Sequence, residues 1–194
     1  MILFNNLDKS FSNVSIIFVD SRVLKTQQIQ LDNMIIFSDD NKKIHSINLL
    51  DNKLLDIKPS SKFGALNAEQ IAKLSSVLVK NGFALENEPK IIYGLITKRE
   101  KHPKSEKLFV LEVLINKETN EHIQLVTNTL DSQEGKVVVL SLPGTTVFSG
   151  LEVLEGQMLN VKSYGMLSGY RTLGIDREGL IFGTSEQIGK DFDF

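Results

Sequence analysis

The chain has 194 residues, 41% of them hydrophobic, with 24 acidic against 22 basic side chains. This length fits one large domain or two small ones, with enough apolar residues for a core. The chain contains no cysteine, which excludes disulfides, thiolate zinc sites and thiol nucleophiles. Its first residues lack the basic and apolar order of a signal peptide, and no apolar run approaches about 18 residues. We therefore expect a cytoplasmic protein with no membrane partner.

Charge is spread evenly along the chain. Residues 1–89 hold 10 cations and 10 anions, and residues 90–194 hold 12 and 14, so neither half is basic in bulk. The densest basic stretch runs from Lys98 to Lys107 and contains five cations and two anions. Any binding to phosphate must therefore be local. A solvated turn of mixed charge explains the same stretch, and composition alone favours that explanation.

Short apolar runs in the first half predict strands of a meander. They cover residues 14–19, 34–37 and 44–50. Asn67 then opens a predicted helix, with Gln70 at the spacing of a capping box and Gly82 at its left-handed end. The apolar stripe of this helix predicts packing on the small sheet. We expect an N-terminal α/β meander domain with one main helix and without a catalytic constellation.

The charged and polar stretch from Glu86 to Pro89 predicts a domain boundary, because the proline blocks helix continuation. It gives domains of residues 1–86 and 87–194. The second domain has four strand-length runs, at residues 91–96, 108–114, 123–126 and 137–142. These predict a small closed barrel, and periodicity alone does not separate an OB-fold from an SH3-like barrel or a small sandwich. Gly94 is expected to supply a bend or bulge.

Two signatures in the second half carry a family resemblance. The first reads His102-Pro103-Lys104-Ser105-Glu106-Lys107-Leu108, and the second runs from Val161 to Ser168. Together they resemble the OB-fold tRNA-binding domain found in the phenylalanyl-tRNA synthetase β chain, in methionyl-tRNA synthetases and in free-standing tRNA-binding proteins. The pattern of that family is H-P-x-A-D-K-L, C-G-A-x-N-x-x-x-G, A-L-P-G and S-x-G-M-x-C-S-x-x-E-L-G, and residues 91–183 follow it in order.

The first half extends the resemblance, because residues 4–83 are similar to the N-terminal extension of YtpR-type proteins. The implied fold class is α+β, with the meander domain followed by a five-stranded OB-fold β-barrel. The block from Val126 to Asp131 keeps the position of C-G-A-x-N but few of its letters, and Asp131 would repel phosphate where the family has asparagine. The last signature keeps S-x-G-M and has Ser168 where the family has cysteine.

The resemblance implies an RNA-binding face on the barrel. The residues expected to contact RNA are Lys98, Lys101, His102, Lys104, Lys107, Asn128, Lys162, Ser163, Met166, Ser168 and Arg171. Lysines would meet phosphates as point charges, hydroxyls would bind phosphate or the ribose 2′-OH, and Met166 would contact a base. Structural roles compete at several positions. His102 fits a hydrogen-bonded turn, Asn128 a turn former and Met166 a core residue.

Enzymatic chemistry has no pattern to support it. The three histidines are scattered, and there is no phosphate-binding glycine loop and no nucleophile elbow. We expect no cofactor, no metal site and non-catalytic binding of structured RNA through backbone and shape contacts, with tRNA as the ligand. An aminoacyl-tRNA synthetase or another translation component is a further candidate partner, and a homodimer is left open.

The alternative is a chaperone-like or protein-interaction module that uses the barrel on polypeptides. The weak basic balance and the altered block from Thr127 to Asp131 keep this alternative open. Oligosaccharide binding would require exposed aromatic platforms, and a chain with no Trp and three Tyr is poorly equipped for it.

Overall fold

The computed structural model describes residues 1–7 and 9–194. These residues form two compact units. The first unit comprises residues 1–88, 144–152 and 194, and the second comprises residues 89–143 and 153–193. The predicted division into an N-terminal domain of residues 1–86 and an RNA-binding domain of residues 87–194 stays a prediction. Across residues 1–7 and 9–194, no helix has the length and apolar character needed to cross a membrane.

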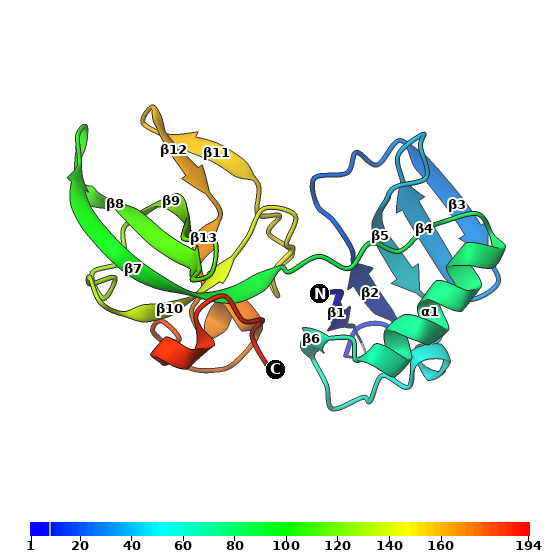
Figure 1. The fold of residues 1–194 in the computed structure, drawn as a ribbon. Helices are drawn as coiled ribbons and strands as arrows, with labels where there is room; N and C mark the ends of the chain where they lie inside the picture. Colours follow the sequence, from blue (N-terminus) through cyan, green and yellow to red (C-terminus); the bar gives the residue numbers. More distant parts are fainter. Residues whose placement is uncertain (8) are drawn as a thin grey trace. The chain divides into compact units, whose positions relative to one another are not determined.

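The first unit is a six-stranded antiparallel sheet with one α-helix packed on it (Figure 1). Its elements are β1 (Leu3–Asn6), β2 (Ser15–Phe18), β3 (Gln27–Leu31), β4 (Met34–Ser38), β5 (Ile44–Leu49), β6 (Phe63–Ala65) and α1 (Ala68–Lys80). The three predicted strands are confirmed as β2, β4 and β5. The order β3-β4-β5-β2-β1-β6 is not a simple meander, because β5 pairs with β2 after the β3–β5 meander.

Helix α1 begins and ends where local chemistry predicts. The Asn67 side chain accepts a hydrogen bond from the Gln70 amide, and the Gln70 side chain accepts one from the Asn67 amide, both at 2.9 Å. This reciprocal capping box satisfies two amide groups that the first helical turn leaves open. After the helix, Gly82 has a φ of 77°, the left-handed conformation that glycine adopts without strain.

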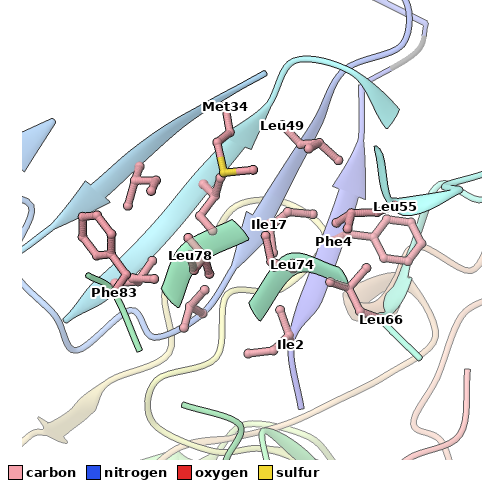
Figure 2. Packing of buried hydrophobic residues seen from close by; sticks show 14 of the residues in the cluster. Ile2, Phe4, Ile17, Met34, Leu49, Leu55, Leu66, Leu74, Leu78 and Phe83 are labelled. Carbon is pink, nitrogen blue, oxygen red and sulfur yellow. The ribbon is translucent and has the colours of Figure 1, made fainter. Parts of the chain in front are cut away.

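The core of the first unit lies between the sheet and α1. Phe4, Ile17, Ile47 and Ile36 form one cross-strand row on the covered face, and all four are buried. Leu74 and Leu78 of α1 belong to the same cluster, and both are fully buried (Figure 2). Burial of each such side chain contributes about 1.5–3 kcal/mol, so the first unit has a hydrophobic core of its own.

The second unit is a curled antiparallel sheet with a separate two-stranded ribbon (Figure 1). Its strands are β7 (Ile91–His102), β8 (Ser105–Asn116), β9 (Glu121–Thr127), β10 (Val137–Ser141), β11 (Glu155–Met158), β12 (Val161–Tyr164) and β13 (Met166–Leu167). The sheet order is β13-β10-β7-β8-β9, and β11 pairs with β12. The order β10-β7-β8-β9 is a Greek key. Both β12 and β13 contact β9, so the sheet curls toward closure, which fits an OB-like fold.

Strands β7 and β8 continue beyond the apolar runs that predicted them. The polar residues Lys98 to Lys101 remain paired with β8, where Arg99 lies opposite Leu111 and Lys101 opposite Phe109. The register shifts between Ile96 and Lys98, where the strand leaves the apolar core. Hydrophobic periodicity does not predict the extended part of these strands, because its side chains are mostly polar.

No β-bulge lies at Gly94, and the bend considered there stays a prediction. Gly94 pairs in regular register with Val138, and the nearest register shift lies further along β7. A Cβ atom at this position would lie 2.7 Å from Leu140 Cδ1 and 2.7 Å from Val113 Cγ1. The glycine is therefore required by close packing inside the curled sheet.

We expect Gly94→Ala to lower the free energy of unfolding by about 1–3 kcal/mol, because the added methyl overpacks the core. Gly156→Ala is the matched control in β11, since a Cβ there would meet no atom within 4 Å. Urea denaturation of both variants measures the difference. Equal stability of the two variants would contradict this role for Gly94.

Candidate nucleic-acid interface

The basic stretch of the sequence forms the two arms of the β7–β8 hairpin. Because neighbouring strand residues point to opposite faces, its cations are divided between two surfaces. Lys98 lies opposite Glu112, and its ammonium forms a 2.8 Å ion pair with Glu100. The hydrogen bond from Lys98 to Glu100 raises the pKa of the lysine. Lys98 is thus partly neutralised on its own face.

A cross-strand row joins the basic stretch to the altered loop after β9. Lys101 lies opposite Phe109, and Phe109 lies opposite Thr127. Thr127 ends β9, and its hydroxyl accepts a 3.2 Å hydrogen bond from the Thr129 amide. Asn128, between them, has an exposed side chain. The structure therefore places Lys101 and the Asn128 loop at the same end of the sheet.

His102 connects the β7–β8 turn to the β11–β12 ribbon. Its ring is buried, Nδ1 accepts a 3.1 Å hydrogen bond from the Lys104 amide, and Nε2 lies 3.0 Å from the Met158 carbonyl oxygen. A nitrogen that accepts an amide hydrogen must be unprotonated, so Nε2 carries the proton and donates to the carbonyl. Both ring nitrogens are occupied within the protein. His102 therefore forms the hydrogen-bonded turn that was considered for it, and its contact with RNA stays a prediction.

The β12 strand is attached to β9 by side-chain hydrogen bonds. Gln124 donates to the Lys162 carbonyl at 2.7 Å. The Ser163 hydroxyl accepts from the Val126 amide at 3.0 Å and donates to the Gly165 carbonyl at 3.2 Å. Ser163 is buried, so its hydroxyl serves this junction. The side chain of Lys162 remains exposed beside β9.

The end of the second signature lies against β10. Ser168 is fully buried, with its hydroxyl 2.7 Å from the Ser141 hydroxyl. Met166 is half-buried and pairs with Ser141. Gly165 has a φ of 110°, and a side chain there would collide with the Ser141 carbonyl. The close backbone approach that Gly165 permits is thus made within the protein.

Arg171 follows this segment, and its exposed guanidinium lies 2.9 Å from Glu178. RNA contacts by Met166, Ser168 and Arg171 stay predictions. Apart from the ion-paired Lys98, the predicted RNA-contacting residues that are exposed on the β7–β8 hairpin, the loop after β9 and the β11–β12 ribbon form what we call the hairpin surface. It consists of Lys101, Lys104, Lys107, Asn128 and Lys162.

Arg99 is absent from the set predicted to contact RNA, yet it has the closest cation–aromatic contact that the structure records. Its Cζ atom lies 3.5 Å from the centroid of the Phe109 ring. Its backbone amide donates a 2.7 Å hydrogen bond to Glu134. The contact depends on how β7 and β8 are paired, which hydrophobic periodicity does not predict.

Across residues 1–7 and 9–194, no group of His, Asp or Glu side chains could hold a metal ion.

Comparison with known proteins shows homology to proteins and protein segments connected with tRNA. The chain is 26% identical over 145 residues to the Bacillus subtilis protein YtpR, a candidate tRNA-binding protein by name, covering 72% of this chain and 70% of YtpR. It is 34% identical over 106 residues to the phenylalanine–tRNA ligase β subunit of Clostridium acetobutylicum, covering 52% of this chain and 13% of the subunit. For the Clostridium tetani β subunit the identity is 30% over 118 residues, with coverages of 59% and 14%.

The chain thus spans only a small part of the ligase subunits that it matches. A solved structure of a MetRS-related protein from Pyrococcus horikoshii aligns with a TM-score of 0.37 at 24% identity, covering 53% of this chain and 87% of that chain. No family model matches the sequence.

The buried serine pair gives a direct test of the internal role of the second signature. We expect Ser168→Ala to lower the free energy of unfolding by about 1–3 kcal/mol, because the Ser141 hydroxyl loses its buried partner. The double change Ser141→Ala with Ser168→Ala should recover part of that loss, since neither hydroxyl then remains. Urea denaturation measures both, and tRNA affinity serves as the second readout. Unchanged stability with weakened tRNA binding would place Ser168 on the RNA instead.

Proposed function

We propose that this homologue of YtpR and of the phenylalanine–tRNA ligase β subunit binds structured RNA without catalysis, with tRNA as its ligand. The observation that carries the proposal is the hairpin surface. Cations and an amide from three sequence segments are held together by the Lys101–Phe109–Thr127 row and by the contact of His102 with Met158. The names of the relatives support tRNA as the ligand.

The expected mode of binding follows from the charge distribution. The chain has a formal net charge of −2, so attraction to RNA must come from local groups. Lys101, Lys104 and Lys107 are exposed on one hairpin and would meet successive phosphates. Phosphate contacts position a ligand without reading its sequence. The exposed amide of Asn128 can add hydrogen bonds to a sugar or a base edge.

We further propose that residues 87–194 form a five-stranded OB barrel in which the β12–β13 segment is the closing strand. The contacts of β12 and β13 with β9 support this arrangement. OB barrels bind oligonucleotides on one face and through the adjoining loops. A synthetase or another translation component is a second proposed partner, supported by the relation to the ligase subunit.

Binding of polypeptides is the second candidate function, and one observation favours it. The β11–β12 ribbon and the residue just before it expose Leu154, Met158 and Leu159, at 49%, 43% and 53% of their surfaces. Exposed apolar side chains of this kind fit a protein partner better than a phosphate backbone. The two candidates differ in their dependence on salt.

We expect tRNA affinity to fall roughly 40- to 500-fold between about 50 and 200 mM salt, as counterion release predicts for about 3–5 phosphate contacts. Filter binding of bulk tRNA to the full chain measures the slope. The double change Lys104→Gln with Lys107→Gln should reduce that slope by about two, since each lysine accounts for about one contact. Lys58→Gln in the first unit is the control and should leave it unchanged.

A flat salt dependence, or an equal effect of Lys58→Gln, would contradict the hairpin surface as the RNA site. Tight binding of an unfolded protein together with a flat salt response would favour the polypeptide candidate.

A further inference from the structure

The side chain of Arg99 lies flat on the ring of Phe109. Its Cζ atom is 3.5 Å from the ring centroid, which is van der Waals contact between a planar cation and the ring face. An edge-on guanidinium would hold Cζ further from the centroid. The strands support this geometry, because Arg99 lies opposite Leu111 and Phe109 is two residues before Leu111 on the same face.

The guanidinium of Arg99 has no carboxylate partner within the described residues. Its Nε atom is buried without a hydrogen bond, whereas Arg22 is paired with Asp20 and Arg171 with Glu178. The nearby Glu134 carboxylate accepts from the backbone amide of Arg99. The position of the guanidinium is therefore fixed by stacking and by the strand. Its charge is not neutralised by an ion pair.

Two lysines lie on the same face of the hairpin as the stacked pair. Lys101 is two residues after Arg99 on β7, and Lys107 is two residues before Phe109 on β8. Both side chains are exposed, and alternate residues of a strand share a face. The Arg99 guanidinium has one face on the Phe109 ring, and a lysine lies near it on each strand. This combination suits a nucleotide, with the base on the guanidinium plane and the phosphates beside the lysines.

We propose that Arg99, stacked on Phe109, is the binding site for one unstacked nucleobase of the RNA. RNA-binding proteins hold splayed bases on aromatic side chains and on arginine planes. The guanidinium of Arg99 takes the base on its outward face, and Lys101 and Lys107 hold the neighbouring phosphates. The site therefore requires an unpaired nucleotide, which a loop supplies and a perfect duplex does not. This inference rests on the proposed RNA-binding function and adds the ligand class to it.

A purely structural role for Arg99 makes a different prediction. As a cover for the apolar end of the sheet, the arginine stem would be replaceable by another long side chain at no cost to RNA binding. Arg99→Lys keeps the charge and loses the plane, and Arg99→Met keeps the apolar cover and loses both. The two substitutions together separate stacking from charge and from packing.

The test compares bulk tRNA with a blunt-ended RNA duplex on the full chain. We expect Arg99→Lys to weaken tRNA binding roughly 5- to 150-fold, the range for loss of one stacked base, with the salt slope unchanged. Affinity for the duplex should stay within about twofold. Arg99→Met should weaken tRNA binding to at least the same extent, because it removes both the plane and the charge. Arg177→Lys is the matched control, because Arg177 also stacks on an aromatic ring, that of Tyr170 at 4.3 Å.

Several outcomes would overturn the inference. One is that the Arg99→Lys variant binds tRNA as tightly as the wild type does. Another is that the variant loses affinity for tRNA and for the duplex equally, which would indicate damage to the sheet. The melting temperature of the variant checks for such damage. If the wild-type chain binds no tRNA at low salt, the proposed function itself fails, and the two failures are thereby distinguished.

Discussion

The buried ring of His102 is the contact on which the arrangement of the second unit's hairpins depends. It accepts the Lys104 amide on one nitrogen and donates to the Met158 carbonyl with the other. A neutral imidazole has one donor and one acceptor, so this ring satisfies both hairpins only in that single tautomer. Without the ring, the hydrogen bond that joins the β7–β8 turn to the β11–β12 ribbon would be lost. The ring thus joins the turn that carries Lys104 to the ribbon that carries Lys162.

The two units contribute in different ways. The first has a closed apolar core around Ile17 and Leu74 and balanced surface charge. The second extends the polar arms of β7 and β8 past its core, which exposes Lys101 and Lys107 on strands and Lys104 in the turn between them. Strands hold side chains at fixed spacing, so a stacked pair such as Arg99 and Phe109 keeps its geometry. The fold alone does not imply RNA binding, and the proposal depends on these side chains.

Local signals predicted the elements whose chemistry is local. The capping box of Asn67 and the left-handed Gly82 each depend on residues close together in the sequence, and helix α1 lies between them as predicted. Strand β3 was not predicted, because three of its five residues are polar and exposed, as an edge strand allows. The hydroxyls of Ser163 and Ser168 have hydrogen-bond partners far along the chain, which no local pattern reveals, and their RNA contacts, expected from the family resemblance, stay predictions. The Arg99 contact required knowledge of strand register.

Mapping backbone amide chemical shifts during a titration of the full chain with tRNA tests the central claim most directly. We predict that the largest changes fall in residues 98–109, 127–131 and 158–163, which form and adjoin the hairpin surface. Amides of the first unit should change little. Largest changes within residues 1–88, or changes spread evenly over both units, would contradict the account.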